Sequence, residues 1–170
     1  MPLAEELLRH ARFLAELNPG PSPTQVDLRR AVSSAYYALF HLLSDEAARR
    51  VAAGLSRDLQ VKTQRTLDHK DIYIVAGVFA NEGKEKIDEK GIVLPEPISN
   101  KLANVAKRFR TLQEQRHIAD YDVLKSFDRI DVLELVSTAE DAFADWNAVR
   151  ATANAQAFLT ALAFWKSWKK

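Results

Sequence analysis

The sequence predicts an all-α fold, an up-and-down bundle of about five helices. The chain has 170 residues, a typical length for one domain with one core. Its 47% hydrophobic and 28% charged residues are a globular mix, and 5 Gly and 6 Pro leave few loops. Apolar residues recur at helical spacing from Leu3 to Leu17, where "NPGPSP" ends the first helix. We expect a single helical domain over residues 1–170, with 150–170 as a C-terminal helical extension.

A second helix is predicted from Thr24, a plausible N-cap, to about Ala53. Its middle, "SSAYYALFHLL", is apolar around most of its circumference, which is typical of a central helix contacted on several sides. Tyr37 and His41 lie one turn apart in this helix and could form a hydrogen bond. They are candidates for supporting a functional site, and the alternative is that they are core residues with satisfied polar tips.

The third helix is predicted from about Asp58 to Ala80. Within it, "DIYIVAGVF" alone could form a strand, but no second strand-like run is present to pair with it. The next segment, Asn81 to Asn100, has two Gly, two Pro and alternating charge. This composition predicts one long exposed loop.

A fourth helix is expected from Pro97 or Ser99 to Gln115, continuing through Tyr121 if the segment stays helical. This helix is basic, so it could contact a phosphate backbone. Alternatively, it is a solvated face, since acids and bases nearly balance over a chain of net charge +1. The basic side chains that could bind RNA or a nucleotide are Lys107, Arg108, Arg110 and Arg116.

A fifth helix should begin near Ser126 or Asp128 and continue past Trp146. The remaining segment, residues 150–170, extends it or forms a sixth helix. Its end, "AFWKSWKK", could contact a partner, a membrane surface or RNA. The plainer interpretation is a last helical turn whose aromatic side chains pack on the bundle or on a dimer mate.

The sequence lacks the residues and motifs of several classes of functional site. The chain contains no cysteine, and its four histidines lie in different segments without a partner at metal-ligand spacing. No glycine-rich phosphate loop or HExxH motif is present. We therefore expect no metal site and no cofactor. The longest apolar run, residues 157–165, is too short to span a bilayer, and the charged N-terminus is unlike a signal peptide. These features predict a soluble cytoplasmic protein without membrane association.

The densest group of ionisable residues is "QEQRHIADYD", residues 113–122. In a helix, Arg116 would face Asp120 and His117 would face Tyr121, each four residues apart. As a functional site, the arginine could neutralise a phosphate while the histidine or tyrosine handles a proton. As a structural network, the same pairs would only lock the helix end.

Two stretches together, "LRRAVSSAYYALFHLLSDEA" and "RHIADYD", resemble the HEPN superfamily of small helical-bundle proteins. They are most similar to the branch with "AYYAxFH" and "R-x-x-A-D-Y" motifs. Arg116 matches the motif arginine, His117 takes the polar position beside it, and Asp120 and Tyr121 match the branch. The resemblance marks these four as candidate catalytic residues.

The resemblance implies a bundle that often dimerises. Many members are metal-independent ribonucleases whose site forms across a dimer cleft, and bacterial members are often toxins paired with a nucleotidyltransferase antitoxin. No histidine follows His117 in this chain, so the downstream histidine of the ribonuclease motif has no counterpart. Tyrosine, with a pKa near ~10, is a poor substitute as a base for RNA cleavage.

Three functional interpretations follow. The first is a homodimeric HEPN-like module that binds RNA or a nucleotide around Arg116 and His117, with a nucleotidyltransferase as the expected regulatory partner. The second is an active metal-independent endoribonuclease of the toxin type, with both residues at a dimer cleft. The third is a non-enzymatic interaction scaffold, in which the two side-chain pairs are packing links.

Overall fold

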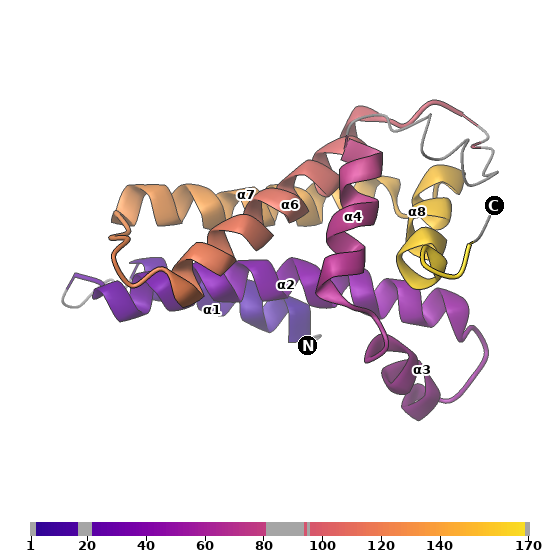
Figure 1. The fold of residues 1–170 in the computed structure, drawn as a ribbon, viewed down its shortest axis with the longest axis horizontal. Helices are drawn as coiled ribbons and strands as arrows, with labels where there is room; N and C mark the ends of the chain where they lie inside the picture. Colours follow the sequence, from indigo (N-terminus) through magenta and orange to yellow (C-terminus); the bar gives the residue numbers. More distant parts are fainter. Residues whose placement is uncertain (1–2, 17–21, 81–93, 95, 169–170) are drawn as a thin grey trace. The chain divides into compact units, whose positions relative to one another are not determined.

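The computed structural model describes residues 3–16, 22–80, 94 and 96–168. All regular secondary structure within these residues is helical, which confirms the predicted all-α class. Contacts group the chain into two compact units, Met1–His41 with Arg108–Ala144 (unit 1) and Leu42–Lys107 with Asp145–Lys170 (unit 2). The helices, labelled in Figure 1, are α1 (Leu3–Glu16), α2 (Gln25–Val51), α3 (Arg57–Gln64), α4 (His69–Ala80), α6 (Asn100–Tyr121), α7 (Arg129–Val149) and α8 (Ala153–Phe164).

The described part of the chain has seven helices rather than about five. The predicted helix from Asp58 to Ala80 is interrupted, because the side chain of Asp68 accepts the backbone N–H of Lys70 at 2.7 Å and begins α4 as a separate helix. The strand alternative for "DIYIVAGVF" is wrong, since this run lies in α4. Most of the loop predicted over 81–100, residues 81–93 and 95, lies outside the described residues.

Unit 1 contains α1, the first part of α2, the last part of α6 and the first part of α7. Tyr36 of α2 is fully buried, and its ring centroid lies 5.6 Å from that of Phe109 in α6. Arg12 of α1 binds α7 by donating from Nε to Glu140 at 3.0 Å and from Nη2 to Ser137 at 3.1 Å. Within unit 1, an aromatic contact therefore joins α2 to α6, and polar contacts join α1 to α7.

Unit 2 contains α3, α4, α8 and the remaining parts of the longer helices. Its core includes the ring of Phe158 in α8, whose centroid lies 5.0 Å from that of Phe79 and 6.3 Å from that of Trp146. The C-terminal segment thus forms its own helix and contributes to the core of this unit. Thr152 caps α8 by accepting the N–H of Ala155 at 3.2 Å.

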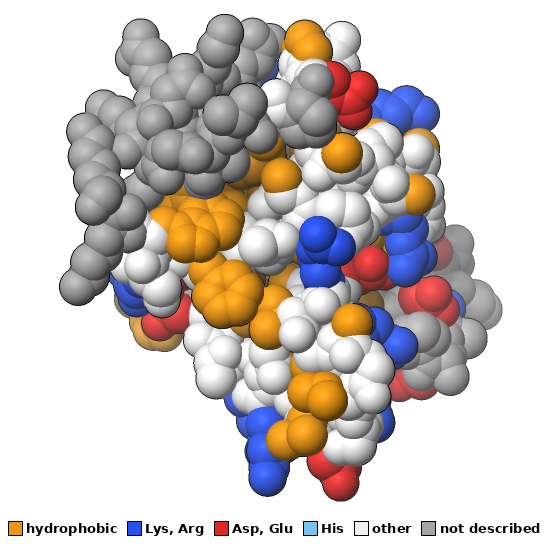
Figure 2. All heavy atoms as spheres, turned by 90° about the vertical axis from the view of Figure 1, so that its right-hand side faces the viewer, with side chains coloured by type: hydrophobic (Ala, Val, Ile, Leu, Met, Phe, Trp, Pro, Cys, Tyr) orange, Lys and Arg blue, Asp and Glu red, His pale blue; other side chains and the backbone are white. Residues whose placement is uncertain are grey.

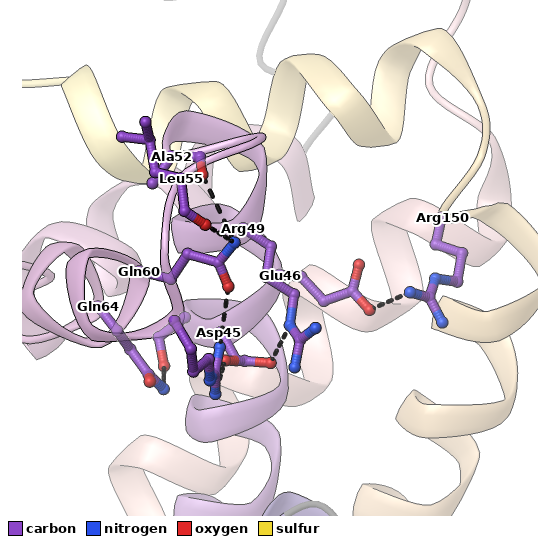
Figure 3. A network of polar contacts seen from close by, with 10 residues as sticks. Asp45, Glu46, Arg49, Ala52, Leu55, Gln60, Gln64 and Arg150 are labelled. Atoms are coloured by element: carbon purple, nitrogen blue, oxygen red, sulfur yellow. Dashed lines mark hydrogen bonds and ion pairs between the residues drawn. The ribbon is translucent and has the colours of Figure 1, made fainter.

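A polar network connects α2 and α3 within unit 2 (Figure 3). Asp45 lies 2.7 Å from Arg49 and 2.7 Å from Arg57. Burial by itself raises the pKa of Asp45, but hydrogen bonds and charges from these two arginines outweigh it and lower the pKa below its usual range. The side chain of Gln60 also donates to the carbonyl of Leu55 at 3.3 Å, beside the turn that follows α2.

Hydrophobic side chains also reach the surface of unit 2. Figure 2 shows several groups of them separated by charged and polar side chains, on the side where Figure 1 has α3, α4 and α8. The larger exposed apolar side chains of this unit are Val51, Leu55, Leu59, Ile74 and Phe164. Among the described residues, no helix combines the length and apolar character needed to cross a membrane.

Candidate functional site

The candidate site lies in unit 1, where α6 ends at Tyr121. The last turn of a helix leaves backbone carbonyls without helical partners, and Arg29 of α2 supplies donors to this end. Its Nη1 donates to the carbonyl of Ala119 at 2.8 Å, and its Nη2 donates to the carbonyl of Asp122 at 2.8 Å and also to that of Lys125. A cation at the negative end of the helix dipole is also electrostatically favourable.

Two further contacts fix the connection between α6 and α7. Gln25 pairs with the backbone of Phe127, donating to its carbonyl at 2.8 Å and accepting its N–H at 2.9 Å. The side chain of Asp122 accepts the N–H groups of Leu124 at 3.0 Å and Lys125 at 3.2 Å, as in an Asx-turn. The backbone just beyond the candidate residues is therefore held from both α2 and its own side chains.

Arg116 is held between two helices of unit 1. Its Nη2 donates to the hydroxyl of Tyr37 at 2.7 Å, and its Nε lies 2.6 Å from the carboxylate of Asp120. The guanidinium carbon also lies 5.9, 5.3 and 5.8 Å from the ring centroids of Tyr36, Tyr37 and Tyr121. The ion pair with Asp120 was predicted from the four-residue spacing and is confirmed.

These contacts keep Arg116 charged. Burial lowers its pKa, but interactions with Tyr37, Asp120 and Tyr121 raise it more, so the pKa lies above its ordinary value. The side chain is 22% exposed. Arg116 can therefore act as a fixed positive charge and a hydrogen-bond donor, but not as a base or a proton donor near neutral pH.

His117 and Tyr121 form the second predicted pair, with ring centroids 4.9 Å apart and an interplanar angle of 48°. The histidine is exposed, and Tyr121 is 65% exposed. Adjacent helical positions point in different directions, so Arg116 and His117 do not face each other directly. Tyr121 contacts both and links the guanidinium to the imidazole.

Tyr37 and His41 of α2 were predicted to support the site, and they differ in their contacts with Arg116. Tyr37 contacts Arg116 directly through its hydroxyl. His41 contacts Tyr37, with the two ring centroids 6.4 Å apart. Both side chains are half-buried, and Tyr36, the neighbour of Tyr37, is the fully buried tyrosine. Tyr37 is therefore the member of the pair that takes part in the candidate site.

The basic residues of α6 are divided between the two units. Lys107 is exposed and belongs to unit 2, whereas Arg108 and Arg110 belong to unit 1. Arg108 lies 3.4 Å from Asp141, and Arg110 lies 4.0 Å from Glu114. These ion pairs fit the solvated-face interpretation for the two arginines.

An open pocket of about 350 Å³ adjoins the candidate residues, with Ser33, Tyr37, Ala119 and Asp120 in its lining. Ser33 donates to the Oδ1 of Asp120 at 2.6 Å. Sequence reasoning missed Ser33 and the arginines of α2. A signal was present, since polar side chains recur at helical spacing at positions 30, 33 and 37.

The described residues contain no group of three or more potential metal ligands. No protein-family model, curated protein or solved structure matched the chain. The HEPN resemblance therefore stays a hypothesis that rests on the two sequence motifs. The arrangement itself offers a fixed guanidinium, an exposed imidazole, an exposed phenol and a polar pocket.

Proposed function

We propose that the protein is a HEPN-like module that binds RNA or a nucleotide through unit 1, around Arg116 and His117. The observation that carries the proposal is the state of the Arg116 guanidinium. Tyr37 and Asp120 engage its Nη2 and Nε, while its Nη1 makes no hydrogen bond with the described part of the chain. A charged donor held in place in this way suits recognition of a phosphate.

The exposed rings beside Arg116 add a second reason. Unpaired bases of single-stranded RNA stack on aromatic side chains, and each such contact contributes about 1–3 kcal/mol. His117 and Tyr121 lie side by side at the surface with their ring planes tilted by 48°, so a base could stack on either exposed ring. A phosphate on Arg116 with a neighbouring base on these rings is the complex we propose.

The test is the affinity for a labelled single-stranded RNA, measured by fluorescence anisotropy at several salt concentrations. Arg116→Ala should weaken binding and reduce the slope of log Kd against log salt by about 0.7–1, the share of one phosphate contact. His117→Ala should weaken binding by about fivefold or more through lost stacking, with little change in slope. Arg9→Ala, at an exposed position of α1, is the control for loss of a surface charge.

Arg116 also contacts Tyr37 and Asp120, so Arg116→Ala could weaken binding by destabilising the fold. The thermal unfolding of Arg116→Ala and the binding of Arg116→Lys are therefore measured as well. The lysine variant keeps a positive charge but loses the guanidinium fork. Binding that both Arg116→Ala and His117→Ala leave at the wild-type level would refute the proposal. Equal weakening by Arg9→Ala would show only a general charge effect.

A second candidate is a metal-independent endoribonuclease, favoured by the exposure of His117. Histidine is the side chain that most readily exchanges a proton near neutral pH, and a homodimer could bring two copies to one phosphate. This candidate predicts RNA cleavage in the presence of EDTA that His117→Ala abolishes. Cleavage that persists in the variant would exclude this role for His117.

The scaffold interpretation is favoured by the links that Arg116 makes to Tyr37 and Asp120. It predicts that Arg116→Ala lowers the melting temperature and that the wild-type protein binds no RNA. A homodimer and a nucleotidyltransferase partner belong to the proposal as well. Light scattering of the purified chain, alone and with the product of an adjacent nucleotidyltransferase gene, tests both.

A further inference from the structure

The pocket in unit 1 has an uneven distribution of charge. Arg29 and Arg30 of α2 line it together with one acid, Asp120. Arg29 is occupied by the carbonyls at the end of α6, and Asp120 is paired with Arg116. Arg30 is exposed and makes no hydrogen bond or ion pair with the described part of the chain. The pocket lining therefore has an excess of positive charge, and Arg30 is the arginine in it whose donors have no partner among the described residues.

Ser33 and Asp120 add hydrogen-bond acceptors to the lining of the same pocket. The hydroxyl of Ser33 donates to Asp120, so its oxygen can still accept a hydrogen bond, next to the carboxylate. A ligand hydroxyl could donate to the Ser33 oxygen, which the bond to Asp120 holds in place. Arg30 and Ser33 are three residues apart on α2, which places their Cβ atoms roughly 5–6 Å from each other.

A ligand that binds both Arg30 and the Ser33–Asp120 acceptors has an anionic group and, close to it, a hydroxyl group that donates. A ribonucleotide has this combination in its phosphate and its ribose 2′-hydroxyl, and carboxylates commonly bind ribose hydroxyls. The pocket volume of about 350 Å³ is at the lower end of the range for small-ligand sites and suits one nucleotide. The apolar side chains of Val26 and Ala119 complete the lining.

We propose that this pocket binds one ribonucleotide, with the phosphate on Arg30 and the 2′-hydroxyl on the Ser33–Asp120 pair. The inference rests on the proposed function and deepens it, because it assigns the distinction between ribose and deoxyribose to Ser33 and Asp120. The nucleotide could belong to an RNA strand or be a free monophosphate. The chemistry recognised is the same in both cases.

The experiment compares four probes: a single-stranded RNA, a DNA of the same sequence, AMP and 2′-deoxy-AMP. Oligonucleotide binding is followed by anisotropy, and the monophosphates by calorimetry. Wild-type protein should prefer each ribose form over its deoxy counterpart. Ser33→Ala should lower the affinity for ribose forms about fivefold and leave deoxy forms unchanged, so that the preference disappears.

Arg30→Ala should weaken ribose and deoxy forms alike by about tenfold, because its phosphate contact is common to both. Arg30 is exposed, so this variant is expected to fold even if Ser33→Ala does not. Arg9→Ala, an exposed arginine of the same unit that does not line the pocket, should bind all probes like the wild type.

The outcomes separate this inference from the proposed function. Binding that is limited to RNA or to AMP and that Arg30→Ala weakens supports the pocket and shows whether the nucleotide belongs to a strand or is free. Wild-type binding that Arg30→Ala leaves intact overturns the pocket but not the proposed function, as does a ribose preference that survives in Ser33→Ala. A wild-type protein that binds none of the four probes overturns both.

Discussion

Replacing Arg29 should destabilise unit 1 although the residue lies at the protein surface. Arg29→Ala removes hydrogen bonds to the carbonyls of Ala119, Asp122 and Lys125, and a cation–π contact with Phe127 at 5.6 Å. Only the bond to Ala119 is partly buried, and a bond of this kind to a charged group contributes about 1.5–2 kcal/mol. The exposed bonds and the helix-end charge should add about 1 kcal/mol.

The expected loss is therefore about 2–3 kcal/mol, which for a chain of this length lowers the melting temperature by about 5–10 °C. The neighbouring Arg30→Ala is a matched control, because it removes the same side chain from the same helix without a described partner. It should change stability by less than about 0.5 kcal/mol. Arg29→Lys should recover part of the loss, since an ammonium keeps the charge but not the fork.

The assay is urea unfolding of the three variants and the wild type, followed by circular dichroism. The reasoning requires a lower midpoint for Arg29→Ala with little change in the slope m. Hydrogen exchange should also become faster for the amides of residues 119–127, which the arginine holds in place. Equal midpoints for Arg29→Ala and Arg30→Ala would refute the account of the helix end given above.

Two further predictions concern other parts of the molecule. The pKa of Asp45 is lowered in the folded state, so its stabilising effect is fully present above the unfolded pKa near ~4 and is lost as the pH falls through the lower folded pKa. The difference in free energy of unfolding between wild type and Asp45→Asn should therefore shrink below about pH 4 in acid-unfolding measurements. A difference that stays constant with pH would contradict this account of Asp45. Phe158→Ala, in the buried core of unit 2, should cost about 3–5 kcal/mol in urea unfolding. Phe13→Ala removes a 60% exposed ring and should cost less than about 1 kcal/mol, so similar losses for the two variants would contradict the burial argument.

The sequence predicted local features of the site and missed those that join distant segments. Arg116 with Asp120 and His117 with Tyr121 follow from helical spacing alone, and the structure has both pairs. The bond from Arg116 to Tyr37 joins residues 79 positions apart. Spacing within one helix contains no information about which side chains of another helix lie opposite, so this contact could not be predicted from periodicity.

The helix boundaries show the same limit. The end of α6 at Tyr121 was within the predicted range, which extended from Gln115 to Tyr121. The break between α3 and α4 was missed, since residues 58–80 contain no proline and only one glycine near the end. The local signal was Asp68, whose side chain satisfies a backbone N–H at the start of α4. Aspartates also lie inside helices of this chain, as at Asp45 and Asp141, so the residue type alone does not identify a break.

The same contacts that make Arg116 a structural link also determine how it could act on a ligand. Tyr37 and Asp120 hold the guanidinium in one orientation, so binding would not have to restrict a side chain that otherwise loses about 2 kcal/mol of rotamer entropy. The negative charge of Asp120 also offsets part of the attraction of Arg116 for an anion. Arg30 has no such counter-charge among the described residues. A phosphate on Arg116 should therefore be oriented by the fixed guanidinium but attracted less strongly than a phosphate on Arg30.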